Sequence, residues 1–283
     1  INLWISEFGR DKTEDLCAWF NEQPKLTARI NTILIDIPQC LTMLNEQGWA
    51  VTQDSNYEDI IYINSHRGSL EKSEAFIKGY ITFMDKASML VARLVNPQPG
   101  ERILDCCAAP GGKSMYMATL MDNVGSLMSC DIHEHKIELM NSNADRLGAS
   151  IVHTKVQDAT KLPNSWNSYF DRVLVDAPCS GLGILQKKLD MRWRKQESIL
   201  SELPSLQLAI LERAAMTVKE KGYLIYSTCT LNYKENEEVV EAFLQKHKEF
   251  SIIPVADDFP LKSNSGMITT YPPRDHMDGF FMA

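Results

Sequence analysis

Two cysteines in this 283-residue chain stand where a side chain can take part in covalent chemistry. Cys179 follows the apolar run "RVLVDAP" and Cys229 follows "YLIYST", so each thiol comes just after an expected strand, in a tight polar turn. A thiolate is a strong nucleophile, and a nearby positive charge or helix amide lowers the pKa of the thiol that forms it. Because we expect the two strands to adjoin, the pattern indicates a site that uses two thiols. The local sequence does not decide which of them attacks.

Four of the expected strands end at an aspartate: Asp105, Asp131, Asp158 and Asp176. In a doubly wound sheet the ligand lies beyond the carboxyl ends of the strands, and acids there favour a ligand rich in hydroxyls and amines. The turn "CCAAPGGKS" fails the triphosphate-loop spacing, because Cys107 stands where the first glycine is needed. Asp131 comes about 20 residues after the glycine turn, where an acid binds ribose hydroxyls. We expect a nucleoside with little phosphate, although Asp131 and Asp158 could instead cap the following helices.

A basic stretch with an aromatic residue follows Cys179. The segment "QKKLDMRWRK", residues 186–195, includes Trp193 and has Asp190 as its one acid. Its cations are Lys187, Lys188, Arg192, Arg194 and Lys195. Such a stretch can neutralise phosphates and stack a base, and a solvated helix face with one anchoring tryptophan is the alternative. Its place beside the cysteine turn favours contact with nucleic acid.

The elements that must position these residues alternate from Arg102 onward. Short β-rich apolar runs are followed by helical stretches, a pattern typical of a parallel sheet covered by helices on both faces. The final runs "FSIIPV" and "GFFMA" are expected to add edge strands. Before this region, residues 1–75 look like a smaller α+β unit with a helical lead-in, so we expect a second domain over residues 76–283.

Composition excludes several classes of protein. The chain is 44% hydrophobic with a net charge of −8, and no apolar run approaches the roughly 20 residues that a membrane helix needs. The start lacks the pattern of a signal peptide, so a cytoplasmic location is expected. The seven cysteines show no C-x-x-C pair, and His133 and His135 have no further ligands at suitable spacing. We expect neither a disulfide framework nor a metal.

Five segments together resemble one known family, and they cover nearly the whole chain. They are "NEQPKLTARIN", "LDCCAAPGGKS", "DAPCSGLG", "YSTCTLNYKENEE" and "DGFF". In this order and spacing they resemble the Nop/Sun family of RNA (cytosine-5)-methyltransferases, most closely its bacterial members that act on small-subunit ribosomal RNA. The resemblance implies a Rossmann-like fold, S-adenosylmethionine as methyl donor and an RNA-recognition role for residues 1–75. It also implies an all-helical domain ahead of Ile1.

Donor-binding residues carry over by position. The resemblance implies that Asp131 accepts the ribose hydroxyls, that Asp158 accepts the adenine amine, and that Asp176 faces the methionine end and the incoming base. The loop around the amino-acid end of the donor consists of Cys107, Ala108, Ala109, Pro110, Gly111, Gly112 and Lys113. The two glycines also allow close backbone approach, whatever the ligand.

The resemblance assigns separate roles to the two thiols. Carbon 5 of cytosine is a weak nucleophile until a thiolate adds to carbon 6, which is covalent catalysis. Cys229 is implied as that nucleophile, and Cys179 assists release after methyl transfer. Asp176 in its protonated form is our candidate donor to the ring N3. The base must be single-stranded or flipped out.

The expected partner is RNA, most simply a cytidine of 16S ribosomal RNA. We expect Lys187, Lys188 and Arg192 to contact phosphates, and Trp193 to contact RNA or to be structural. Alternatives are methylation of tRNA or DNA, or a catalytically silent RNA-binding factor in ribosome assembly. The chain departs from the family pattern at three positions, Met84, Leu189 and Tyr233, which weakens any inference about which RNA is recognised.

Overall fold

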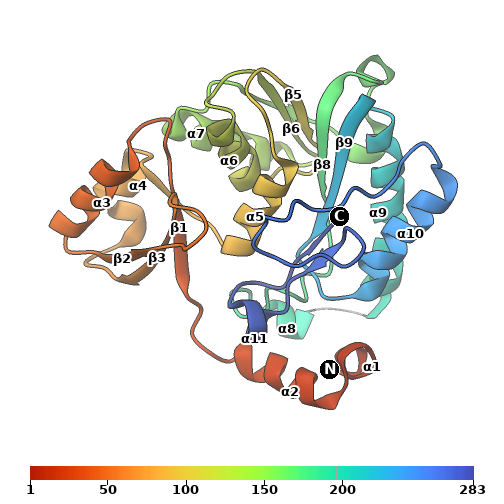
Figure 1. Ribbon diagram of the computed structural model, residues 1–283, viewed down its shortest axis with the longest axis horizontal. Helices are drawn as coiled ribbons and strands as arrows, with labels where there is room; N and C mark the ends of the chain where they lie inside the picture. The colour runs from red at the N-terminus through yellow and green to blue at the C-terminus, as the bar shows by residue number, and fades with distance from the viewer. Residues whose placement is uncertain (195–196) are drawn as a thin grey trace.

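A computed structural model describes residues 1–194 and 197–283, and it places them in two β-sheets with their covering helices (Figure 1). The chain begins with two helices, α1 (Asn2–Phe8) and α2 (Arg10–Trp19). An antiparallel sheet of order β2-β3-β1-β4 follows. Its strands and helices are β1 (Leu26–Ile30), α3 (Ile37–Glu46), β2 (Ala50–Gln53), β3 (Ile60–Ser65), α4 (Glu74–Ile77) and β4 (Ile81–Phe83). β4 pairs with β1, so the small sheet continues beyond residue 75. The expected division into two domains at residue 75 stays a prediction.

The small sheet forms because its strands present apolar side chains to the helices on one face. Ile30, Ile61 and Ile81 lie in one buried cluster with Leu44 of α3. The helix α3 starts at Asp36, whose carboxylate accepts a hydrogen bond from the backbone N–H of Gln39 at 2.8 Å. Such a cap satisfies a donor that the first helical turn leaves free.

The second sheet has seven strands in the order β10-β11-β9-β8-β5-β6-β7. Five of them are parallel: β5 (Arg102–Asp105), β6 (Ser126–Asp131), β7 (Val152–Val156), β8 (Phe170–Asp176) and β9 (Val218–Thr228). The helices are α5 (Lys86–Val95), α6 (Gly112–Leu120), α7 (Glu134–Leu147), α8 (Met191–Arg194), α9 (Glu197–Ala215), α10 (Glu237–Lys246) and α11 (Pro272–Asp275). The strand order reverses between β5 and β8, which is where such sheets bind ligands. The expected doubly wound α/β fold is confirmed.

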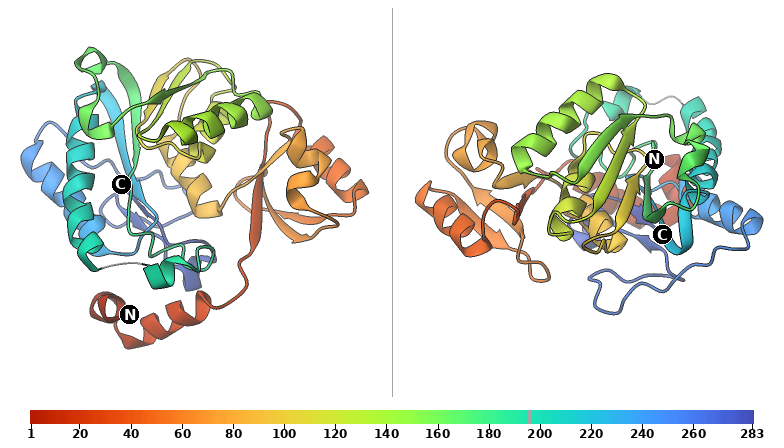
Figure 2. Two further views of the ribbon diagram at one scale, coloured as in Figure 1. Left: turned by 180° about the vertical axis from the view of Figure 1, so that it is seen from behind. Right: turned by 90° about the horizontal axis from the view of Figure 1, so that it is seen from above.

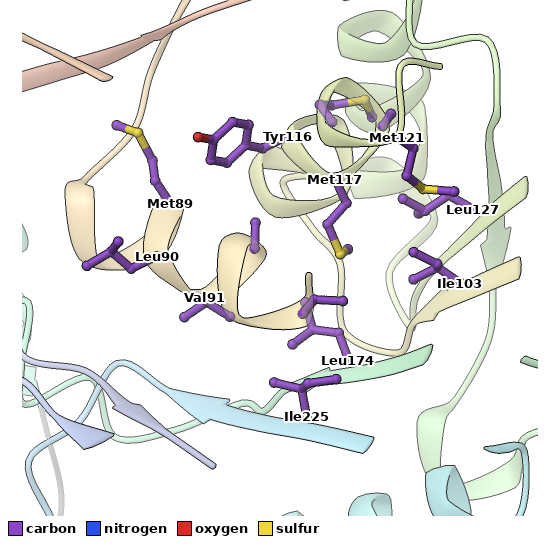
Figure 3. Close-up of a cluster of buried hydrophobic side chains, with 14 of the residues drawn as sticks. Met89, Leu90, Val91, Ile103, Tyr116, Met117, Met121, Leu127, Leu174 and Ile225 are labelled. Carbon is purple, nitrogen blue, oxygen red and sulfur yellow. The ribbon is translucent and has the colours of Figure 1, made fainter. Parts of the chain in front are cut away.

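Alternation along the strands builds a core on each face of this sheet. Ile103 and Leu174 pack with α5 and α6 (Figure 3), whereas their neighbours Leu104 and Val175 pack with α9 and α10. Successive strand residues point to opposite faces, so one apolar run serves both layers. Figure 2 shows the helices on the two sides of the strands.

The carboxy-terminal region departs in part from expectation. The run "GFFMA" contains a strand as expected, β11 (Phe281–Met282), but this strand pairs with both β9 and β10 and is not at the edge of the sheet. Residues 250–255, however, form no strand, so that prediction was wrong, and the outer edge is β10 (Ile268–Thr269). No helix among the described residues is long and apolar enough to cross a membrane.

A buried polar cluster joins the small sheet to α6. Tyr116 of α6 donates to Asp59 Oδ2 at 2.7 Å and accepts from Arg93 Nε at 2.7 Å, and Arg93 also pairs with Asp59. Arg29 of β1 is fully buried, stacks on the Tyr116 ring and donates to Thr119 at 3.1 Å. Burial lowers the pKa of Arg29 to about 10. Since α6 begins at the glycine turn, the small sheet helps to fix the site.

Removing the hydroxyl of Tyr116 tests how much this cluster stabilises the fold. We expect Tyr116→Phe to lower the free energy of unfolding by about 1–3 kcal/mol, because Asp59 and Arg93 each lose a buried partner. The measurement is urea denaturation followed by circular dichroism. Tyr169→Phe, at a residue that is 44% exposed, is the matched control and should change stability by less than about 0.5 kcal/mol.

Candidate active site

The two candidate thiols lie side by side. Cys179 is in the loop after β8 (residues 177–186, the Pro-Cys loop) and Cys229 is in the loop after β9 (residues 229–236, the Thr-Cys loop). Their Sγ atoms are 3.2 Å apart, and the backbone N–H of Cys229 donates to Cys179 Sγ at 3.3 Å. Both are partly exposed free cysteines. The structure therefore brings together the two residues that the sequence selected.

An ion pair stands beside these thiols. Lys113, at the start of α6, donates to Asp176 Oδ2 at 2.6 Å, and Ser227 donates to the other carboxylate oxygen at 2.7 Å. Burial alone would lower the pKa of Lys113, but the charge and hydrogen bond of Asp176 outweigh it and raise that pKa. The pKa of Cys229 is raised by its hydrogen bond with Cys179 and by burial, while the charge of Lys113 acts in the opposite direction. Lys113 is thus the cation that can favour a thiolate here.

Asp176 accepts a hydrogen bond on each of its carboxylate oxygens, from Lys113 and from Ser227. The role expected for its protonated form, as donor to the ring N3, stays a prediction.

The glycine turn forms the wall of the site between β5 and α6. Gly111 has a φ of +96°, a left-handed conformation that side chains rarely adopt, and Gly112 opens the helix. Ala108 N–H donates to the carbonyl of Cys130 on β6 at 2.7 Å, which fixes the turn to the sheet. Burial and neighbouring acids raise the pKa of Cys107, which lines this turn.

Asp131 ends β6, and Asp158 lies beyond the end of β7. Asp158 caps the short 3-10 helix that follows it, whereas the N-cap of α7 is His133 and not Asp131. Asp158 accepts from the N–H of Thr160 at 2.9 Å and from its hydroxyl at 2.7 Å, and the hydroxyl bond is the main cause of its lowered pKa. Asp131 accepts from the N–H of His133 at 2.9 Å. Ile132 follows Asp131 directly, and its apolar side chain is 59% exposed. It was not among the residues expected at the site, although its position directly after an acid at a strand end could have indicated it.

Part of the basic stretch is engaged in contacts within the protein. Lys187 pairs with Asp85 and with Asp278, the latter at 3.0 Å. Arg192 donates to the Asn21 side chain at 2.9 Å and to the carbonyl of Phe20. These two cations therefore already have partners inside the protein.

The other two residues expected to contact RNA face solvent. Lys188 is exposed and Trp193 is 88% exposed. Lys195 lies outside the described residues. The described residues contain no group of three or more potential metal ligands.

Asp105, at the end of β5, is a buried acid behind the site. It accepts from Ser114 at 2.7 Å, and its other oxygen has no partner among the described residues. Burial raises its pKa from 3.8 to about 7. The folded protein therefore binds this proton more tightly than the unfolded chain does, and the associated stability is lost as the pH rises from about 4 to about 7.

Replacing the carboxyl of Asp105 tests whether its pKa is raised in the folded protein. Between pH 4.5 and pH 7.5 we expect the free energy of unfolding to fall in the wild type and to fall less in Asp105→Asn. The difference between the two falls should be on the order of a few kcal/mol. Urea denaturation at several pH values measures this difference. Asp257→Asn, at an exposed loop position, should follow the wild-type curve. Equal slopes for all three proteins would contradict the assignment.

The parallel sheet, its glycine turn and the acids at its carboxyl edge define a Rossmann-like methyltransferase domain, here with two adjacent thiols. The chain belongs to the family described as 16S rRNA methyltransferase RsmB/F, whose model matches residues 92–283. Residues 1–68 match the ferredoxin-like domain of RsmF/B-like methyltransferases. The resemblance stated from the motifs is confirmed.

Curated relatives agree with this assignment, and solved structures share the fold. The chain is 38% identical over 288 residues to the probable ribosomal RNA small subunit methyltransferase B of Bacillus subtilis, and 36% identical over 294 residues to that of Synechocystis. It is fully covered in both matches, and it spans 64% and 65% of these relatives. The crystal structure of PH0851 superposes with a TM-score of 0.93 at 32% identity, covering 99% of this chain and 63% of the other. NSun6 from Pyrococcus horikoshii, solved with SFG, shares the fold with a TM-score of 0.89 at 21% identity, covering 99% and 95%.

Proposed function

We propose that this protein transfers a methyl group from S-adenosylmethionine to carbon 5 of a cytidine in RNA, in 16S ribosomal RNA in particular. The observation that carries the proposal is the thiol pair, 3.2 Å apart at the ligand edge of the sheet, with Lys113 and Asp176 beside it. Family membership supports ribosomal RNA as the substrate. With such a substrate we expect the protein to act in the cytoplasm.

The residues at the carboxyl edge fit S-adenosylmethionine. The carboxylate of Asp131 suits the two ribose hydroxyls, the exposed side chain of Ile132 suits a face of the adenine ring, and Asp176 suits the positive sulfonium end. Asp158 would accept the adenine amine, although it also caps a turn. Bound there, the donor supplies an electrophilic methyl group. The turn from Cys107 to Lys113 would hold its amino-acid end.

Cys229 is the nucleophile in this proposal. It passes its proton to the carboxylate of Asp176, and the thiolate forms a bond to carbon 6 of the cytosine, so that ring electrons move toward N3 and make carbon 5 nucleophilic. Asp176 then passes that proton to N3. Lys113 keeps its own proton, and its charge favours the thiolate.

Release of the product requires a second group near the adduct. After methyl transfer the proton on carbon 5 must leave, so that the electrons of that bond form the ring double bond and expel the Cys229 thiolate. Cys179 lies within reach of this step, since its Sγ is 3.2 Å from that of Cys229. The geometry is nearly symmetric between the thiols, and the family resemblance supports this division of roles.

RNA contact in this proposal rests on the exposed part of the basic stretch. Trp193 offers an open ring for stacking, and Lys188 offers an exposed cation. Lys187 and Arg192 would contact phosphate only by giving up their present partners.

Single cysteine substitutions test the roles of the thiols. With donor and RNA present, Cys179→Ala should accumulate a covalent protein–RNA adduct, because release is blocked, and Cys229→Ala should form none. Denaturing gel electrophoresis measures the shifted band. Cys17→Ala, at a half-exposed residue of α2, should methylate RNA as the wild type does. The reverse pattern of adducts would exchange the two roles.

The donor site is tested by Asp131→Asn. The new side chain keeps an oxygen for the His133 N–H but loses the negative charge, so we expect affinity for S-adenosylmethionine to fall about 10- to 100-fold. Isothermal titration calorimetry measures it directly. Asp145→Asn, at an exposed position of α7, is the control and should leave affinity unchanged.

Substrate class is decided by incubation with labelled donor and, separately, 16S ribosomal RNA, transfer RNA and DNA. We expect label in 5-methylcytidine of the ribosomal RNA. Label only in transfer RNA or DNA would replace the substrate, and binding without label in any of them would indicate a silent assembly factor.

A further inference from the structure

A buried glutamate connects the loops that carry the two thiols. Glu235 is in the Thr-Cys loop, six residues after Cys229, and its side chain is fully buried. Its Oε2 accepts from the backbone N–H of Ser180, the residue that follows Cys179, at 2.8 Å. Its Oε1 accepts from the Asn232 side chain of its own loop at 2.9 Å. One carboxylate thus contacts both loops.

A helix fixes the same carboxylate from a third direction. Gln207 of α9 donates through one Nε2 to Glu235 Oε2 at 3.0 Å and to the carbonyl of Pro178 at 2.9 Å. The backbone carbonyl of Glu235 accepts from the hydroxyl of Tyr226, on β9, at 2.6 Å. The peptide units on either side of Cys179 are therefore both attached to the Glu235 cluster.

The chemistry of this cluster is that of an anion held by neutral donors. An ionised carboxylate only accepts hydrogen bonds, and it can take several. The three donors to Glu235 are amide N–H groups, from Ser180, Asn232 and Gln207. A buried charge is costly to desolvate unless its hydrogen bonds are well formed. The two loops must therefore stay together for these bonds to remain complete.

We propose that Glu235 is a positioning residue that holds the Pro-Cys and Thr-Cys loops at the separation at which Cys179 and Cys229 act on one base. It touches neither sulfur in the described contacts. It acts through Ser180 on one side and Asn232 on the other. This role rests on the proposed use of both thiols, yet the separation of the sulfurs can be measured without methyl transfer.

Oxidative cross-linking provides that measurement on the free protein. Diamide accepts two hydrogens at its N=N bond and becomes the hydrazine, while the two thiols lose them and form an S–S bond. Peptide mass spectrometry gives the rate at which Cys179 and Cys229 become linked, by the loss of two hydrogens. Linkage between thiols depends on their approach, and misplacement by about 1 Å can slow a reaction by up to about 100-fold.

Two variants of Glu235 disturb its hydrogen bonds in different ways. Glu235→Gln keeps the length of the side chain, but its amide NH2 group faces an N–H donor that the carboxylate oxygen accepts from. Glu235→Asp keeps the carboxylate, but the side chain is one methylene group shorter. We expect both to slow cross-linking by about tenfold or more. We expect kcat for RNA methylation to fall likewise, with the affinity for S-adenosylmethionine unchanged. Glu238→Gln, an exposed glutamate three residues further along, should behave as the wild type.

The outcomes distinguish this role from a general effect on stability. Melting temperatures are measured alongside. Cross-linking at the wild-type rate in Glu235→Gln or Glu235→Asp would overturn the proposal, whether or not the melting temperature falls. Slow cross-linking in both, with the Glu238 control unaffected, would support it. If Cys229→Ala retained full methylation, the proposed function would fail, while the cross-linking result would still report on Glu235.

Discussion

The parallel pairing of β8 with β9 is the constraint on which the rest of the site depends. Its register sets Val175 opposite Tyr226 and Asp176 opposite Ser227, so the loops that follow leave the sheet at the same edge. Parallel strands end together, which puts two cysteines that are far apart in the sequence within 3.2 Å. A slip of one residue would turn the side chains of β9 to the opposite face and lose both the core and the site.

Burial of charge shapes the chemistry at this edge. Lys113 and Asp176 are held as a pair, and the charge of Lys113 opposes the rise in the pKa of Cys229 that its neighbour and burial produce. Asp105 lies behind them with a pKa near 7, raised by burial. The site therefore has Lys113 next to the thiols and a buried acid of raised pKa, Asp105, behind them. That arrangement suits a reaction that needs a thiolate and a transferable proton.

Local sequence patterns predicted the features that follow from chain order. Alternating strands and helices gave the sheet, and the residue types at strand ends located Cys179, Cys229 and Asp176. The ion pairs of Lys187 could not be predicted from the sequence, because Asp85 and Asp278 lie in distant segments that come together only in the folded chain. The run at residues 250–255 is apolar enough for a strand, but it does not join the sheet, whose outer edge is β10.

The buried polar cluster between the small sheet and α6 limits which amino-terminal modules can be exchanged between related proteins. Arg29 and Asp59 come from the small sheet and the adjoining turn, whereas Tyr116 and Thr119 belong to the helix that opens at the glycine turn. A chimaera that receives its amino-terminal module from another parent would inherit only half of this cluster. Compatible parents must therefore match at these four positions, because a mismatch would disturb the helix that begins at the glycine turn.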